Sequence, residues 1–204
     1  MKQVLPSVVL EGRFVRLEPL ADTHILGLQA ALTDGELWQI RETLIPTIDE
    51  VPAFIEAAKH SHLSGDELTF AIIDKSSGRI VGSTRYLRAM LSHQRVEIGY
   101  TFIARSLQGT GINTEAKLLM LDHAFNQWKC RRVGLITDPN NHVSQRAIEK
   151  LGAVKEGIMR EHMMLRDGYV RDSVIYGILQ HEWQQTSVMI RERLYGEMRL
   201  EAIE

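Results

Sequence analysis

The sequence predicts a mixed α/β domain of α+β-like character, in which helices flank one central sheet. Short runs rich in β-branched and aromatic residues alternate with longer segments of helical periodicity. Several predicted strands follow one another through short turns, which favours antiparallel pairing. No low-complexity linker or internal repeat interrupts the 204 residues, so we expect a single domain over residues 1–204.

The N-terminal half is expected to contain two helices and four strands. Thr47 and Glu50 have capping-box spacing at the start of the second helix, and Pro52 falls in its first turn, where proline is tolerated. The turn at 75–79 separates two strands that pair naturally as a hairpin. In chain order, the predicted elements are a strand at 13–18, helices at 21–32 and about 47–63, and strands at 68–73, 80–87 and 96–103.

The C-terminal half alternates helices with strands. Leu118, Leu121, Phe125 and Trp128 fall on one face of a helix that follows a glycine-containing loop. Asp167-Gly168 is the turn between the last two strands. The remaining predicted elements are a strand at 132–137, a helix at 143–151, strands at 154–165 and 170–178, and a helix at roughly 182–200 within a C-terminal helical extension of about 182–204.

Composition indicates an ordinary globular protein. The chain is 44% hydrophobic and 25% charged, and 24 basic residues nearly balance 26 acidic ones. This balance gives no electrostatic reason to expect nucleic-acid binding. The apolar runs are too short for a signal peptide or a membrane span, and the single cysteine, Cys130, allows no intrachain disulfide. We therefore expect a cytoplasmic protein with neither nucleic acid nor membrane as a partner.

Residues 106–116, SLQGTGINTEA, place two glycines in front of a predicted helix. A Walker-type loop ends in Gly-Lys-Ser/Thr, but here Gly111 is followed by Ile112 and Asn113. A dinucleotide fingerprint needs a third glycine in the required place, and it is missing. Two alternatives remain: a turn that only connects a strand to a helix, or a loop whose N–H groups bind a pyrophosphate with help from the helix dipole.

A second motif favours the pyrophosphate-binding alternative. After the strand at 132–137 the chain reads DPNNHVSQRAIEKLGA, where Asn141 and Ser144 have N-x-x-S spacing and Lys150 and Gly152 follow. Asn141 could also cap the next helix, and Gly152 could end it. Together, the two motifs strongly resemble the GNAT superfamily of N-acetyltransferases.

The resemblance covers nearly the whole chain. VEIGYTFIARSLQGTGINTEAKLL is similar to the core GNAT strand, pyrophosphate loop and helix, with Gln108, Gly111 and Asn113 on the three defining loop positions. Asn113 replaces the usual Gly or Ala. The N-x-x-S and K-x-G spacings, LEGRFVRLEPL, EIGY and TEA resemble the Rim-type branch, which acetylates ribosomal-protein N-termini. The resemblance implies the GNAT fold: a central, mostly antiparallel sheet with one splayed strand pair and flanking helices.

The resemblance also implies a co-substrate, acetyl-coenzyme A; no metal is expected. Acetyl-coenzyme A is expected in a V-shaped cleft between the strands that end near Ile103 and Thr137. Its pantetheine arm is expected to pair with backbone near Phe102 and Ile103 and to contact Asn141, and Ser144 is expected near the thioester. The loop expected to hold the pyrophosphate consists of Gln108, Gly109, Thr110, Gly111, Ile112 and Asn113.

Glu97 is the first candidate for a catalytic base. The acceptor amine must lose a proton before it attacks the acetyl carbonyl, and this is harder for a lysine than for an α-amine. Strict strand alternation places Glu97, Gly99 and Thr101 on one face. The alternative is that Glu97 is structural and pairs with an arginine such as Arg85 or Arg95.

Ser144 is the second predicted catalytic residue, as a proton donor to the departing thiolate of coenzyme A. An unassisted hydroxyl is a poor acid. Many GNAT enzymes use a tyrosine after the second motif, but this region reads AVKEGIMREH and has none, which leaves the general acid unassigned. If Glu97 is structural, water or another base such as Glu161 takes its role. His123 and His162 are interpreted as structural or surface residues, because no zinc-ligand spacing is present among the eight histidines.

Two functions remain open from the sequence. The first is an acetyl-coenzyme A-dependent N-acetyltransferase, with an amine of a protein N-terminus or a small molecule as its acceptor. The second is a non-catalytic acyl-coenzyme A sensor with the same fold, which Asn113 and the missing tyrosine leave open. We expect acceptor specificity to lie in 21–63 and 161–170. Trp183 and Leu194 are interpreted as core contacts, and the last helix could also contribute to a homodimer.

Overall fold

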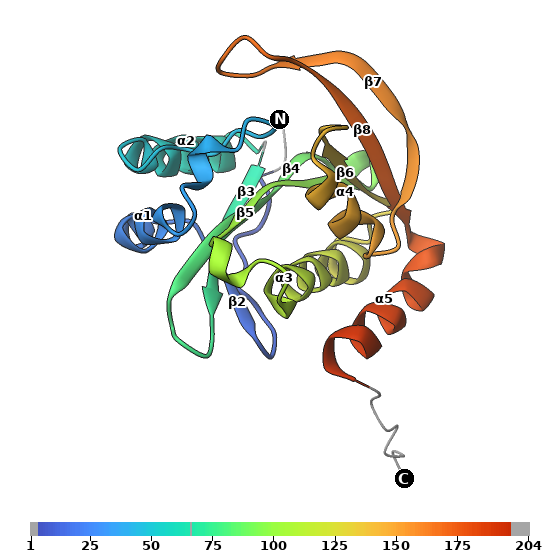
Figure 1. Ribbon diagram of the computed structural model, residues 1–204. Coiled ribbons are helices and arrows are strands. Elements are labelled where there is room, and N and C mark those ends of the chain that lie inside the picture. Colours follow the sequence, from blue (N-terminus) through green and yellow to red (C-terminus); the bar gives the residue numbers. More distant parts are fainter. Residues whose placement is uncertain (1–3, 66, 197–204) are drawn as a thin grey trace.

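The computed structural model describes residues 4–65 and 67–196, which contain one 8-stranded sheet (Figure 1). Its strand order is β1-β2-β3-β4-β5-β6-β8-β7. The pair β5–β6 is parallel, and the other neighbouring pairs are antiparallel. This confirms the predicted mostly antiparallel sheet. The strands are β1 (Leu10–Glu11), β2 (Val15–Pro19), β3 (Glu67–Asp74), β4 (Ile80–Met90), β5 (Arg95–Ile103), β6 (Arg132–Thr137), β7 (Val154–Met164) and β8 (Val170–Leu179).

Helices cover both faces of the sheet. Figure 1 shows α1 and α2 on one side, and α3, α4 and α5 on the other. Each side has its own cluster of buried apolar residues, so the sheet is the middle of three layers. The α-helices are α1 (Ile25–Thr33), α2 (Val51–Leu63), α3 (Gly111–Asp122), α4 (His142–Glu149) and α5 (Gln180–Tyr195).

Several predicted boundaries differ from the observed ones. The segment 22–24 is a 3₁₀ turn, so α1 begins only at Ile25. The Glu50 carboxylate accepts a hydrogen bond from the Thr47 N–H at 2.8 Å, which is one half of the predicted capping box. The last helix ends at Tyr195. The predicted continuation beyond 196 lies outside the described residues.

The Thr-Glu-Ala segment in α3 has a structural explanation, which lies in its glutamate. The Glu115 side chain is fully buried, and its two oxygens accept hydrogen bonds from the N–H groups of Arg13, Phe14 and Val15 at 2.9, 2.6 and 2.6 Å. The Tyr195 hydroxyl donates to the same carboxylate at 2.5 Å. A buried carboxylate needs such donors to offset its desolvation. Glu115 therefore ties α3 to the start of β2 and to α5, which fixes the helix that follows the glycine loop.

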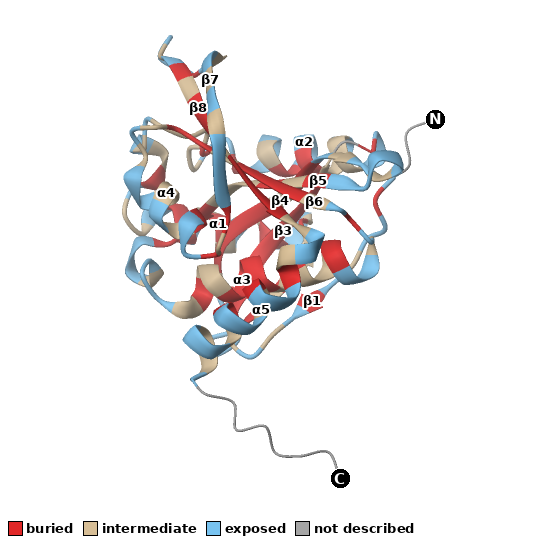
Figure 2. Cartoon of the chain, turned by 90° about the vertical axis from the view of Figure 1, so that its right-hand side faces the viewer, coloured by how far each residue is buried: buried red, intermediate tan, exposed pale blue. Residues whose placement is uncertain are grey.

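Burial decreases toward one edge of the sheet. Figure 2 shows the central strands as buried and much of the edge strand β7 as exposed. Within the described ranges, no helix combines the length and the apolar character needed to cross a bilayer.

Candidate active site

The parallel strands β5 and β6 separate along their length. Their backbone pairing ends at Ile98 and Leu135. Beyond these residues, β5 remains paired with β4 through Ile103, while β6 remains paired with β8 through Thr137. The predicted splayed strand pair is therefore present. A cleft of about 850 Å³ lies along it, which is a size typical of small-molecule sites.

A β-bulge in β5 changes which side chains face the cleft. Thr84 of β4 lies opposite both Tyr100 and Thr101, and Tyr100 has a left-handed backbone with φ of 47°. Thr101 therefore contacts α3, whereas Phe102 packs with α1 and α2. The predicted alternation is thus wrong beyond the bulge, because it placed Thr101 on the face of Glu97 and Phe102 on the opposite face. A left-handed non-glycine residue costs of order 1–3 kcal/mol, and such strain is concentrated at functional sites.

The glycine loop lies at one end of the cleft. Gly109 has a positive φ of 78°, which glycine adopts without strain. Gln108 donates from Nε2 to the Ile103 carbonyl at 3.0 Å, which holds the loop against the end of β5. Thr110 is the N-cap of α3, and its hydroxyl donates to the Leu107 carbonyl at 2.6 Å. The loop thus presents the N-terminal end of a 12-residue helix to the cleft.

Two of the predicted loop residues, Gly111 and Ile112, do not line the cleft. Ile112 is buried in the core beneath α3. A Cβ atom added to Gly111 would lie 2.9 Å from Cδ1 of Leu194 in α5. Close packing of α3 against α5 is therefore a second reason for glycine at this position, beside any approach of a ligand. Leu194 is also confirmed as a partly buried residue packed against the core.

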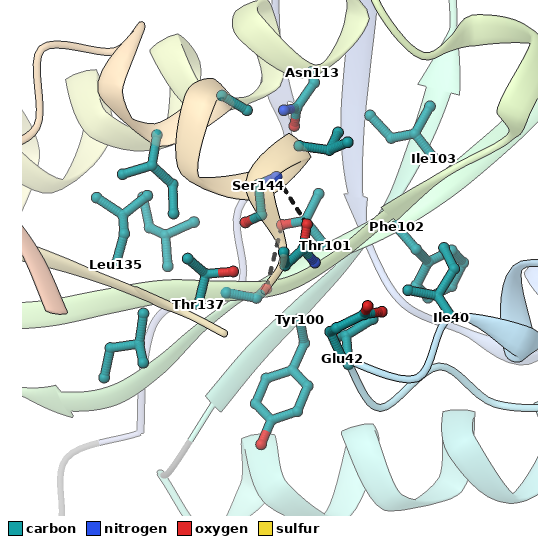
Figure 3. A pocket seen from close by; sticks show the side chains of 18 of the residues that line it. Ile40, Glu42, Tyr100, Thr101, Phe102, Ile103, Asn113, Leu135, Thr137 and Ser144 are labelled. Atoms are coloured by element: carbon teal, nitrogen blue, oxygen red, sulfur yellow. Dashed lines mark hydrogen bonds between the residues drawn. The ribbon is translucent and has the colours of Figure 1, made fainter. Parts of the chain in front are cut away.

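The second motif follows β6, the other strand of the splayed pair, at the start of α4. Asn141 caps α4, and its Oδ1 accepts a hydrogen bond from the Ser144 N–H at 2.9 Å. Both side chains line the cleft. In Figure 3, Asn113 and Ser144 lie toward the glycine-loop end of the cleft, while Tyr100 and Glu42 lie toward the other end. The Oδ1 atom of Asn113 is buried and has no hydrogen-bond partner among the described residues.

Glu97 lines the cleft and is paired with an arginine, though neither of the two expected ones. Its Oε2 accepts from Nη1 of Arg88 at 2.8 Å, and the side chain is 18% exposed. Arg85 is paired with Glu67 instead, at 2.6 Å. Glu97 is therefore held in place by a partly exposed charge pair, while one of its oxygens stays free of that bond.

Lys117, one helical turn after Asn113, is a cleft residue that sequence analysis missed. Its side chain is 5% exposed, and Nζ donates to the hydroxyl oxygens of Thr84 at 2.9 Å and Thr101 at 2.6 Å. No carboxylate within the described part of the chain lies at ion-pair distance from Nζ. Burial lowers the pKa of Lys117 from 10.5 to about 7. Its i, i+4 spacing from Asn113 is the one signal that could have placed it on the cleft side of α3.

A polar cluster from β7 and β8 completes the other end of the cleft. Nε and Nη2 of Arg171 both donate to Oγ of Ser173, at 3.2 and 3.0 Å, and Nη1 donates to the Glu42 carbonyl at 3.3 Å. Nδ1 of His162 lies 2.9 Å from the same Oγ atom. Burial, followed by the positive charges of Arg88 and Arg171, lowers the pKa of His162, so its imidazole is neutral at neutral pH.

His162 was interpreted as structural or surface, but it lines the cleft, whereas the alternative base Glu161 is exposed and does not. No local sequence pattern predicts that His162 or Arg171 lies in the cleft, because their positions depend on how β7 and β8 pair. Of the predicted residues, those that line the cleft are Glu97, Phe102, Ile103, Gln108, Gly109, Thr110, Asn113, Asn141 and Ser144. Across residues 4–65 and 67–196, no three His, Cys, Asp or Glu side chains are grouped so that they could hold a metal ion.

The chain belongs to the GNAT acetyltransferase family, since the family described as "Acetyltransferase (GNAT) domain" matches residues 15–154. It is similar to the probable N-acetyltransferase YjcK of Bacillus subtilis, with 30% identity over 87% of this chain and 100% of that protein. A putative acetyltransferase structure from T. thermophilus is 33% identical, with a TM-score of 0.82 over 95% of this chain and 100% of that one. Mycobacterium smegmatis RimJ, solved with CoA-disulfide, has a TM-score of 0.76 at 22% identity, over 92% of this chain and 93% of that one.

Proposed function

We propose that this chain transfers an acetyl group from acetyl-coenzyme A to an amine, through direct attack of the amine on the acetyl carbonyl. The observation that carries the proposal is the cleft between β5 and β6, which has a helix N-terminus at one end and titratable side chains at the other. The GNAT fold uses acetyl-coenzyme A, and one structural neighbour was solved with a coenzyme A derivative. The residues present fit such a ligand.

The loop end of the cleft suits the pyrophosphate. Free N–H groups and the dipole at the start of α3 favour an anion without a cation in the loop. The unpaired edge of β5 near Phe102 and Ile103 suits the pantetheine arm, which carries amide groups that can pair like a strand. The buried Oδ1 of Asn113 lacks a partner among the described residues, and a hydrogen-bond donor on the bound molecule would satisfy it.

The opposite end of the cleft suits the acceptor and its proton. The carboxylate of Glu97 accepts the proton of the attacking amine, directly or through water. Ser144, which lies nearer the glycine-loop end of the cleft, donates a hydrogen bond to the thiolate as the C–S bond breaks. The segment AVKEGIMREH after the second motif has no tyrosine, so Ser144 is the proposed residue for this role. We propose an amine of a protein N-terminus or of a small molecule as the acceptor, in agreement with the resemblance to the Rim type.

Thiol release tests the proposal. The protein is mixed with acetyl-coenzyme A and a panel of peptides with free N-termini, polyamines and aminoglycosides, and free coenzyme A is measured. Turnover that depends on one acceptor class supports the transferase. Tight binding of coenzyme A without turnover on the whole panel would contradict it and favour the acyl-coenzyme A sensor.

A further inference from the structure

The hydroxyl of Ser173 lies between Arg171 and His162, and its hydrogen bonding restricts the protonation state of the imidazole. A serine hydroxyl has one proton to donate and two lone pairs that accept. Nε and Nη2 of Arg171 both donate to this oxygen, at 3.2 and 3.0 Å. An arginine can only donate, so these two contacts use the two lone pairs. The hydroxyl proton is then left to donate to Nδ1 of His162, 2.9 Å away.

This direction of donation determines the tautomer of His162. In a neutral imidazole one nitrogen carries the proton and the other accepts. Because Nδ1 accepts from Ser173, the proton must be on Nε2. A doubly protonated ring would bring a third donor to Oγ and leave the hydroxyl proton without an acceptor. The neutral form is also favoured by burial and by the charges of Arg88 and Arg171, although Glu97 opposes this.

Nε2 is therefore a hydrogen-bond donor and cannot take the proton of an attacking amine. His162 and Glu97 line the same cleft and lie within electrostatic reach of each other. A carboxylate can only accept hydrogen bonds, so Glu97 suits the N–H groups of the amine. The Nε2–H group of His162 can only donate, so it suits an oxygen atom of the acceptor close to that amine. In a peptide N-terminus or an amino-acid amide, the amine and a carbonyl group are bonded to the same carbon, in the N–Cα–C=O unit. A lysine side chain and a polyamine have no carbonyl beside the amine.

We propose that His162 is a specificity-determining residue, which Arg171 and Ser173 hold as the Nε2–H tautomer so that it binds the carbonyl oxygen of an α-amino acyl acceptor. This inference rests on the proposed acetyl transfer for its substrate but not for its tautomer. It selects one acceptor class among the amines, and it assigns the base role to Glu97 rather than to the histidine.

Nuclear magnetic resonance of histidine-labelled protein tests the tautomer without any turnover. The ring nitrogen and carbon shifts of His162, assigned by their loss in His162→Gln, should report a neutral ring with the proton on Nε2 at neutral pH. Ser173→Ala removes the hydroxyl donor and should shift the ring toward a mixture of tautomers. A proton on Nδ1, or a charged ring at neutral pH, would overturn the proposal.

Kinetics on two acceptors tests the substrate class. L-alaninamide has the carbonyl, and isopropylamine has a methyl group in place of its carboxamide. His162→Leu removes the donor and should lower the ratio of kcat/KM for alaninamide over isopropylamine about tenfold, equivalent to one hydrogen bond. His162→Gln keeps a side-chain N–H but cannot act as a base, and should keep the ratio within about threefold of wild type. An unchanged ratio in the leucine variant, or an equal loss in both variants, overturns the proposal.

The failure of acetyl transfer is distinguishable from the failure of this inference. If the wild type acetylates neither amine, calorimetry on the protein with coenzyme A bound compares the affinities of the same two amines. Tighter binding of alaninamide that is lost in His162→Leu supports the inference, and equal binding of both amines contradicts it.

Discussion

Replacing Lys117 by methionine is expected to stabilise the folded protein at neutral pH. Lys117 is 5% exposed, and the hydrogen bonds of its ammonium go to the uncharged Thr84 and Thr101. Burial lowers the pKa of Lys117 from 10.5 to about 7 in the folded chain, whereas the unfolded chain keeps the ordinary value. Burying the protonated amine of Lys117 therefore lowers the free energy of unfolding of the protein.

The direction of the pH dependence follows from the protons bound in each state. Between about pH 7 and pH 10 the unfolded chain holds a proton on Lys117 that the folded chain has released, so stability rises with pH in this window. Below pH 7 both states hold the proton, and the cost is constant at roughly 4–5 kcal/mol. Lys117→Met removes this cost but also loses two hydrogen bonds, which offsets roughly 1–2 kcal/mol of the stabilisation. The two threonine hydroxyls still bond each other at 2.8 Å. We expect Lys117→Met to be more stable than wild type by about 3 kcal/mol near pH 6.

Urea denaturation between pH 6 and pH 9, without coenzyme A, measures this difference in the free energy of unfolding. The advantage of Lys117→Met should be constant near pH 6 and should shrink by about 1.4 kcal/mol per pH unit between pH 7 and pH 9. Lys155→Met, at an exposed position of β7, is the matched control and should show neither effect. A destabilised Lys117→Met at pH 6, or a difference that does not vary with pH, would refute the reasoning.

Three further substitutions test the cleft. Gly111→Asp brings a negative charge to the loop and should weaken coenzyme A by more than about tenfold in calorimetry; Gly111→Ala controls for the contact with Leu194, and equal affinities in both variants would exclude an electrostatic role. Asn141→Ala should lower the free energy of unfolding by about 1 kcal/mol as a lost cap, and should also weaken coenzyme A binding. A changed Tm with unchanged kinetic constants would leave Asn141 as a cap alone. Glu97→Gln should lower kcat by at least about 10²-fold at neutral pH, with less loss at high pH, where the amine deprotonates unaided. A near-normal pH–rate profile would make Glu97 a structural partner of Arg88.

The parts of the site that could be predicted from the sequence depend on interactions between residues that are close in the chain. The glycine loop, the cap at Asn141 and the strand that holds Glu97 are each set by residues within a few positions of one another. The bulge in β5 could not be predicted in this way. Tyr100 is not a glycine, and the contacts beside its left-handed backbone come from elsewhere: Arg85 stacks over its ring at 4.7 Å, and α3 holds the adjacent Thr101. Period-2 alternation is accurate up to the bulge and fails after it, because one extra residue reverses the faces.

The same division separates the two ends of the cleft that we propose for the acetyl donor and for the acceptor. The donor end is built from one loop and two helix starts, so its residues occur as a motif that is visible in a single sequence. The acceptor end joins segments that are remote in the chain: Arg171 of β8 donates to the Glu42 carbonyl at 3.3 Å, and Arg41 pairs with Asp167 at 2.6 Å. Such contacts leave no spacing rule, since any chain length can separate the partners. Family membership therefore informs about the acetyl donor, while the acceptor has to be inferred from geometry such as the hydrogen bonds around Ser173. The Arg41–Asp167 ion pair is exposed and links the segment that contains Glu42 to the β7–β8 hairpin. Because dissolved salt screens exposed charges, this link weakens at high ionic strength. The proposed acceptor end therefore depends on contacts that the glycine loop does not share.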